Sequence, residues 1–386
     1  MKWTVTSKVH CLISSRRPFP SGERPFAFLL QFCHYSESPV EDALIHLPKI
    51  LSAVLLLSLS LAINVSSGLC VEGQGPHLSR TKLPASVEIK LNIGQRGDRV
   101  DWNIAGHFDG TDPNVLSELT WDRLDIYQLQ IATDLLFDAS GRTRYQYLLR
   151  GMIGLGEIVD GKNRDSDYAG DNRTLEFSRS TNSADAGDVL DLSGGAGLRF
   201  SSQGRRWLLS PMFGFSYHEQ NLRMADGYQA ISEQSIADDF FDPDRLLPPV
   251  GPFQERLNSS YKAKWWGPWI GLEAAFEPTE IWALRGSFAY HFAEYEGKAN
   301  WNLRQDLAHP VSFRHWADGY GLVYGLELTR KLKKGWFCSL STRYQQWQTD
   351  AGIDNTYLDG GAISATRLNE VNWTSSTLML GLVRRF

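Results

Sequence analysis

The chain has 386 residues, a formal net charge of −5 and an aromatic content of 12%. The mild charge, without a long run of Lys or Arg, excludes the basic footprint of a nucleic-acid-binding protein. The mean hydropathy of −0.30 excludes a bundle of membrane-spanning helices, but a transmembrane β-barrel hides its apolar residues at alternate positions and keeps a soluble-looking average. Composition therefore leaves a transmembrane barrel or two soluble domains.

The N-terminal part of the chain predicts targeting rather than a folded domain. Residues 1–45 are irregular and interrupted by Pro and Ser, which indicates an unusually long leader or a start site assigned too early. A charged segment then precedes a Leu-rich run of about 14 residues, Ile50–Ile63, and small residues follow. This order predicts a signal peptide over residues 46–68 and a mature barrel over residues 69–386.

Two long alternating segments joined by a tight polar turn give the clearest structural signal. Apolar and polar residues alternate over Asp125–Phe137, and the alternation resumes over Tyr145–Leu155 after the turn Asp138–Gly141. Successive side chains of a strand point to opposite faces, and a tilted strand needs about 9–11 residues to cross a bilayer. The pair predicts one hairpin of a membrane-spanning barrel.

Alternating segments of this kind recur ten times along the mature chain. They lie at Ser86–Gly97, Asp122–Asp138, Arg142–Asp160, Gly187–Ser201, Arg205–Asn221, Asn258–Phe276, Glu280–Gly297, Val311–Lys331, Gly335–Asp350 and Glu370–Phe386. Short connections alternate strictly with long ones, as do the periplasmic turns and extracellular loops of outer-membrane barrels. The long connections lie around Asp98–Trp121, Gly161–Ala186, Leu222–Leu257, Lys298–Pro310 and Ala351–Asn369. The sequence therefore predicts an all-β fold, a ten-stranded antiparallel transmembrane β-barrel in the bacterial outer membrane.

Four charged residues fall on the predicted inner face of the barrel wall. They are Asp134, Arg150, Arg285 and Glu327. The interior of a ten-stranded barrel is only slightly wider than that of an eight-stranded one, which side chains nearly fill. We expect these residues to form ion pairs that plug the lumen, which argues against an open porin.

Short motifs in these segments resemble those of the omptin family, the ten-stranded outer-membrane aspartyl proteases of Gram-negative bacteria. Leu116–Trp121 resembles the omptin stretch that leads into the second strand, and Trp266–Leu272 is similar to the sixth strand. Asp165–Tyr168 matches the Asp-x-Asp-aromatic motif of the second extracellular loop. The block Asp171–Ser180 is closer to uncharacterised omptin-like barrels, among them the Protochlamydia-type outer membrane proteins.

The resemblance implies a catalytic arrangement in which an Asp pair faces an Asp–His couple across the barrel mouth. Asp165 and Asp167 would form the pair, and Asp306 with His309 would form the couple. In such a site the His takes a proton from water that the Asp pair helps to bind. Asp306 and His309 are three residues apart instead of two, and this spacing puts their side chains on opposite faces of an extended strand.

Other interpretations of these residues stay open. A solvated acidic loop explains Asp165, Asp167 and Asp171 equally well, a Ca²⁺ loop is a further possibility, and His309 is readily explained as a surface residue. No cofactor is predicted, although the resemblance implies that activity would need lipopolysaccharide.

Three functions remain compatible with the sequence. The first is a non-catalytic surface barrel whose long extracellular loops bind lipopolysaccharide, a peptide or a host-surface protein. The second is an omptin-type endopeptidase, and the third is a narrow passive channel. The altered Asp–His spacing favours the first, and no nucleic-acid partner is expected.

Overall fold

The computed structural model describes residues 84–139, 145–202, 204, 206–240 and 246–386. These residues belong to one compact unit, Asn64–Phe386. The predicted leader and signal peptide lie outside the described residues.

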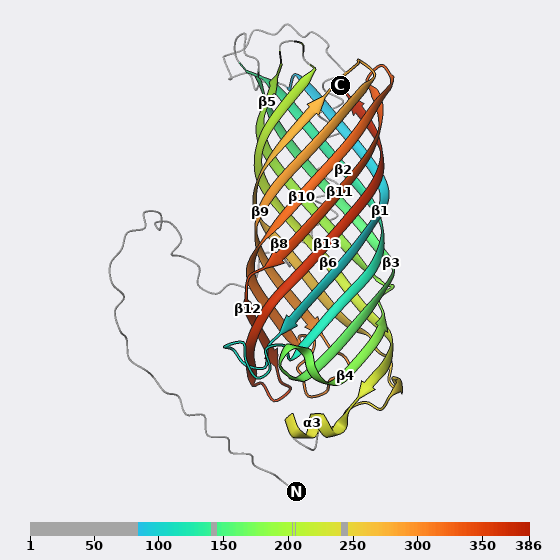
Figure 1. The fold of residues 1–386 in the computed structure, drawn as a ribbon. Coiled ribbons are helices and arrows are strands. Elements are labelled where there is room, and N and C mark those ends of the chain that lie inside the picture. The colour runs from blue at the N-terminus through green and yellow to red at the C-terminus, as the bar shows by residue number, and fades with distance from the viewer. Residues whose placement is uncertain (1–83, 140–144, 203, 205, 241–245) are drawn as a thin grey trace, which may run out of the picture. The chain divides into compact units, whose positions relative to one another are not determined.

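Ten long antiparallel strands form a closed ring (Figure 1). They are β1 (Ser86–Ile104), β2 (Ser117–Asp138), β3 (Tyr145–Gly170), β5 (Gly187–Ser201), β6 (Trp207–Ser232), β8 (Ser259–Phe276), β9 (Trp282–Asn300), β10 (Phe313–Lys333), β11 (Trp336–Thr349) and β13 (Ile363–Arg385). Each pairs with the strands before and after it in this order, and β1 closes the ring with β13. The predicted ten-stranded antiparallel barrel is confirmed.

At two places in the ring, one position between neighbouring strands is occupied by two strands, one above the other along the wall. β4 (Thr174–Ser183) stands between β3 and β6 where β5 does not reach, and β12 (Gly352–Tyr357) stands between β10 and β13 beyond β11. The other short elements are η1 (Asp171–Arg173), α3 (Gln234–Phe240) and β7 (Gly251–Pro252). No helix among the described residues is long and apolar enough to cross a membrane. We call the end with β4 and β12, at the bottom of Figure 1, the extracellular end because the long connections lie there.

A belt of exposed apolar side chains surrounds the half of the barrel nearer the short turns. One row runs through register partners on seven neighbouring strands, each more than a third exposed. The row is Leu284, Leu328, Leu340, Leu380, Ile93, Leu129 and Leu155. Soluble proteins rarely expose a continuous apolar surface of this extent, and a transmembrane barrel requires one. We call this half of the wall the membrane half.

Beyond the belt the strands continue, and the polar and apolar faces exchange sides. In β1, Leu91 and Ile93 point outward, whereas Val100 and Trp102 point inward and are buried. This exchange is what a wall needs when its outside passes from lipid to water. The predicted long loops are therefore too long, because much of each is strand. We call this half the extracellular extension.

The lumen of the extracellular extension is filled by large buried aromatic side chains, which we call the aromatic plug. They are Trp102, Trp121, Tyr261, Trp265, Tyr295, Trp347 and Trp373. Trp347 and Trp373 stack with their ring centroids 5.4 Å apart, and Trp265 lies 5.9 Å from Trp347. Aromatic rings bury large areas, so this packing stabilises the extension as a hydrophobic core does.

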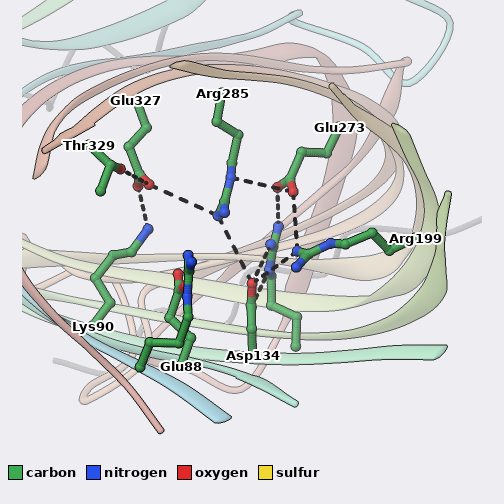
Figure 2. A network of polar contacts seen from close by, with 10 residues as sticks. Glu88, Lys90, Asp134, Arg199, Glu273, Arg285, Glu327 and Thr329 are labelled. Atoms are coloured by element: carbon green, nitrogen blue, oxygen red, sulfur yellow. Dashed lines mark hydrogen bonds and ion pairs between the residues drawn. The ribbon is translucent and has the colours of Figure 1, made fainter. Parts of the chain in front are cut away.

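Charged side chains fill the lumen of the membrane half instead (Figure 2). Arg150 binds Asp134 and Glu273, each at 2.7 Å. Arg285 lies 3.5 Å from Glu273 and 4.0 Å from Glu327, on the two neighbouring strands, and reaches across the lumen to Asp134 at 4.0 Å. The ion pairs predicted among the inward-facing charges are present. We call the connected charged residues of this half the ion-pair network. They are Lys90, Asp134, Arg150, Arg199, Glu273, Arg285 and Glu327.

One Trp in the lumen packs directly onto backbone. A Cβ added to Gly195 would lie 2.7 Å from the Trp269 ring, and one added to Gly214 would lie 2.6 Å from it. Glycine at these positions lets Trp269 lie flat against the wall between the plug and the ion-pair network.

Candidate functional site

The predicted Asp pair lies on a strand of the extracellular extension. Asp165 and Asp167 belong to β3, two residues apart, and therefore point to the same face. Asp165 stands opposite Leu119 of β2, which is buried in the core of the extension. The pair thus lies on the inner side of the wall, in the β3–β4 hairpin whose turn is Asp171–Arg173, and not in an irregular loop.

Burial and a neighbouring carboxyl raise the proton affinity of this pair. The pKa of Asp165 is raised well above its ordinary value, first because the group is buried and second because Asp167 lies beside it. The charge of Arg304 and the side chain of Trp301 act in the opposite direction. Asp165 Oδ1 is buried and has no hydrogen-bond partner. A carboxyl in this setting can donate or share a proton near neutral pH.

The connection between β9 and β10 brings Arg304 toward the Asp pair. Arg304 donates hydrogen bonds to Asp306 from Nε at 2.7 Å and from Nη2 at 2.6 Å. Its charge also acts on Asp165 and Asp167. The structure therefore gathers three of the four predicted site residues around one guanidinium.

The fourth predicted residue has a different partner. The His309 side chain is exposed, and its Nδ1 lies 2.8 Å from Oδ1 of Asn300. Asp306 accepts two hydrogen bonds from Arg304. Asp306 and His309, which are three residues apart in the sequence, thus have different partners.

Two buried carboxylate–imidazole pairs in the lumen were not predicted. The first joins His315 of β10 to Asp354 of β12, with Nε2 and Oδ1 3.1 Å apart. His315 Nδ1 lies 2.8 Å from the Tyr261 hydroxyl, which in turn lies 2.6 Å from that of Tyr295. The sequence offered no signal for this chain of contacts, because Asp354 meets His315 only through the pairing of β10 with β12.

The second pair lies deeper. His218 Nδ1 is 2.7 Å from Asp191, and the same carboxylate accepts a hydrogen bond from Arg96 at 2.8 Å. Both imidazoles of these pairs are at most 4% exposed, so a polymeric substrate has no access to either. Among the described residues no group of three or more His, Cys, Asp or Glu side chains is placed to hold a metal ion.

Comparisons with known proteins agree with the observed fold. The model of the family described as Pom, Protochlamydia outer membrane protein, matches residues 90–386. No curated protein matches the chain. The outer membrane protease OmpT from Escherichia coli is 13% identical, with a TM-score of 0.57 over 80% of this chain and 99% of that one. The translocator domain of the autotransporter NalP from Neisseria meningitidis is 11% identical, with a TM-score of 0.31 over 88% of this chain and 98% of that one. At 13% identity the likeness to OmpT concerns the fold alone.

Proposed function

The chain belongs to the family of Protochlamydia outer membrane proteins, and we propose that it is a closed, non-catalytic surface barrel whose extracellular extension binds a partner. The protein is an outer-membrane β-barrel, so its candidate functions are conduction, catalysis at the mouth and presentation of a surface. The contents of the lumen and of the mouth bear on each of them.

Two layers of side chains argue against conduction. The ion-pair network crosses the lumen of the membrane half, and the aromatic plug fills the lumen of the extracellular extension. A conducting barrel of this width would have to move both layers.

The position of Arg304 is the observation that carries the proposal. General-base catalysis at the mouth needs a neutral imidazole within hydrogen-bond reach of a water held by the Asp pair. Arg304 instead binds Asp306 and acts electrostatically on Asp165 and Asp167. A guanidinium stays protonated at physiological pH and cannot accept a proton from water. This arrangement supports a stabilising charge cluster rather than a hydrolytic site.

The rim of the extension is built to hold its shape. The β3–β4 turn is tied to the β1–β2 connection, because Asn114 donates to Asp171 from its backbone N–H at 2.8 Å and accepts from the Asn172 N–H at 2.8 Å. Exposed apolar side chains stand on this rim, among them Phe108 and Leu175, each 59% exposed. A rigid rim with apolar contact points loses little conformational entropy on binding, which favours a protein or peptide partner.

Lipopolysaccharide is the second partner that we propose, on the outer face of the wall. Lys262, Lys298 and Arg314 are register partners across β8, β9 and β10. They lie on the outward face, a short distance beyond Trp266 and Trp316. A row of cations beside aromatic side chains at the lipid boundary suits phosphate groups of the outer leaflet.

A cleavage assay tests the absence of catalysis. The protein folded in detergent with lipopolysaccharide would be incubated with a peptide library that includes dibasic sequences, beside the double variant Asp165→Asn/Asp167→Asn. We expect no cleavage by either. Cleavage by the wild type that the double variant loses would overturn the proposal and establish the alternative, an omptin-type endopeptidase. The raised pKa of Asp165 beside Asp167 is the observation that favours this alternative.

The lipid contact has its own test. Lipopolysaccharide retained after gel filtration in detergent would be measured as bound phosphate for the wild type and for Arg314→Gln. The control is Arg330→Gln, at the opposite end of β10. We expect a loss of bound phosphate for Arg314→Gln alone, and equal retention by all three proteins would refute the contact.

A further inference from the structure

A cavity of about 130 Å³ lies in the lumen of the membrane half, beside the ion-pair network. Besides charged groups its wall carries hydrogen-bonding side chains, among them Asn92, Gln130, Ser287, Ser341 and Thr377. A cavity of this volume holds several waters, or a small ion together with waters.

Cations outnumber anions around this cavity. Each of its four carboxylates already has an ion-pair partner among the described residues. The pairs are Glu88 with Arg385, Asp134 with Arg150, Glu273 with Arg150, and Glu327 with Lys90. Lys90, Arg150, Arg285 and Arg343 line the cavity beside the four carboxylates. With Arg199 and Arg385, which pair with these carboxylates from outside the lining, six cations meet four carboxylates. The surplus is two positive charges.

Arg343 carries this surplus into the cavity. Its guanidinium lines the cavity, and no carboxylate of the described residues lies within ion-pairing distance of it. Arg96 and Arg150 lie near enough to repel it. Asp191 and Glu327 attract it, but Asp191 is already bound by Arg96 and His218, and Glu327 is already bound by Lys90.

Arg199, a member of the ion-pair network, is also incompletely paired. Its Nε and Nη2 atoms are buried without a hydrogen-bond partner, and the nearest carboxylate oxygens, on Asp134 and Glu273, are both 3.7 Å from Nη2. The two carboxylates are thus shared among several guanidinium groups and have no capacity left for Arg343.

We propose that this cavity binds one small inorganic anion, of halide size, against the guanidinium of Arg343. Inside a protein wall that is itself surrounded by lipid, a guanidinium without a counter-charge is strongly unfavourable. An anion in the cavity supplies that charge, and Ser341 and Thr377 offer hydroxyl donors from the same wall. The anion thereby becomes a structural component of the closed lumen.

Crystals of the full chain grown with bromide in place of chloride test the site directly. We expect an anomalous bromine peak beside Arg343 in the wild type, no such peak in Arg343→Gln and a retained peak in Arg343→Lys. An empty cavity in the wild type, or a peak that Arg343→Gln retains, would overturn the proposal. If Arg343→Gln does not fold, the wild-type and Arg343→Lys maps decide the question by themselves.

Thermal unfolding in detergent gives a second readout. At constant ionic strength, bromide would replace gluconate, an anion too large for the cavity. An anion that binds the folded state alone raises its unfolding temperature, by about 2 °C or more per tenfold increase in concentration above the dissociation constant. We expect this rise for the wild type and for the exposed control Arg330→Gln, and a flat response for Arg343→Gln. Equal responses of all three proteins would contradict the site.

Discussion

Arg304 holds Asp306 through two hydrogen bonds, at 2.7 Å and 2.6 Å, and its charge also acts on Asp165 and Asp167. Three carboxyl groups therefore surround one guanidinium. A single positive charge does not balance three negative charges, so we expect a proton on the carboxyl whose pKa is raised by burial and by a neighbouring carboxyl. This is Asp165.

The first prediction concerns the pH dependence of this carboxyl. Burial and then Asp167 raise the pKa of Asp165 above its value of about 3.9 in the unfolded chain. The folded state consequently binds the proton more tightly, and wild-type stability falls as the pH rises from about 4 through the folded-state pKa. Asp165→Asn does not titrate, so its stability relative to the wild type should be greater at pH 7.5 than at pH 4, by about 1 kcal/mol or more.

Urea unfolding followed by Trp fluorescence, at both pH values, measures this difference. Asp318→Asn, on the exposed outer face of β10, is the control and should show the same relative stability at both. A relative stability of Asp165→Asn that does not change with pH would mean that Asp165 is ionised in the folded state throughout this range.

The second prediction concerns the ion-pair network. Arg150→Met removes the guanidinium that Asp134 and Glu273 share at 2.7 Å. Removal of one partner of a buried pair typically costs about 3–5 kcal/mol, and the nearby Arg199 and Arg285 should reduce the cost here to about 2 kcal/mol. The same urea titration would measure it, with the exposed Arg330→Met as the control. A change below about 0.5 kcal/mol would show that the neighbouring arginines replace Arg150 fully.

The membrane half could be predicted from the sequence because lipid imposes one rule on it. Outward residues must be apolar there, and the resulting alternation sets the limits near the short turns correctly. Ser86 and Asp138 are strand ends in both the prediction and the structure. At the other end β1 was predicted to stop at Gly97 but continues to Ile104. The exchange of polar and apolar faces beyond the belt removes the outward apolar pattern, so the sequence predicts loops where the structure has the extracellular extension.

The candidate site was predictable only in part, for a related reason. Asp165 and Asp167 are neighbours in sequence and share a face of one strand, so a local motif was sufficient. Arg304 approaches them from the β9–β10 connection, and Asp354 meets His315 through strand pairing. These contacts depend on how the wall is closed, which no local spacing encodes.

The third prediction treats the lumen as two closures in series. Trp373→Ala opens space in the aromatic plug, where Trp373 stacks on Trp347, and Arg285→Ser opens space in the ion-pair network. Because the other layer remains, neither variant alone should conduct ions across a planar bilayer. The double variant should show measurable single-channel conductance. Conductance in either single variant would show that one layer alone closes the lumen.

The fourth prediction separates two adjacent glycines of β5. A Cβ on Gly195 would lie 2.7 Å from the Trp269 ring and 2.8 Å from the backbone oxygen of Phe213, whereas a Cβ on Gly194 would meet no atom within 4 Å. Gly195→Ala must displace the Trp269 ring and should destabilise the barrel by about 1–3 kcal/mol, as overpacking does. Gly194→Ala, on the outward face of the same strand, should change stability by less than about 0.5 kcal/mol. Urea unfolding compares them, and because the two changes add the same methyl group, equal effects would mean that Trp269 is not held against the wall.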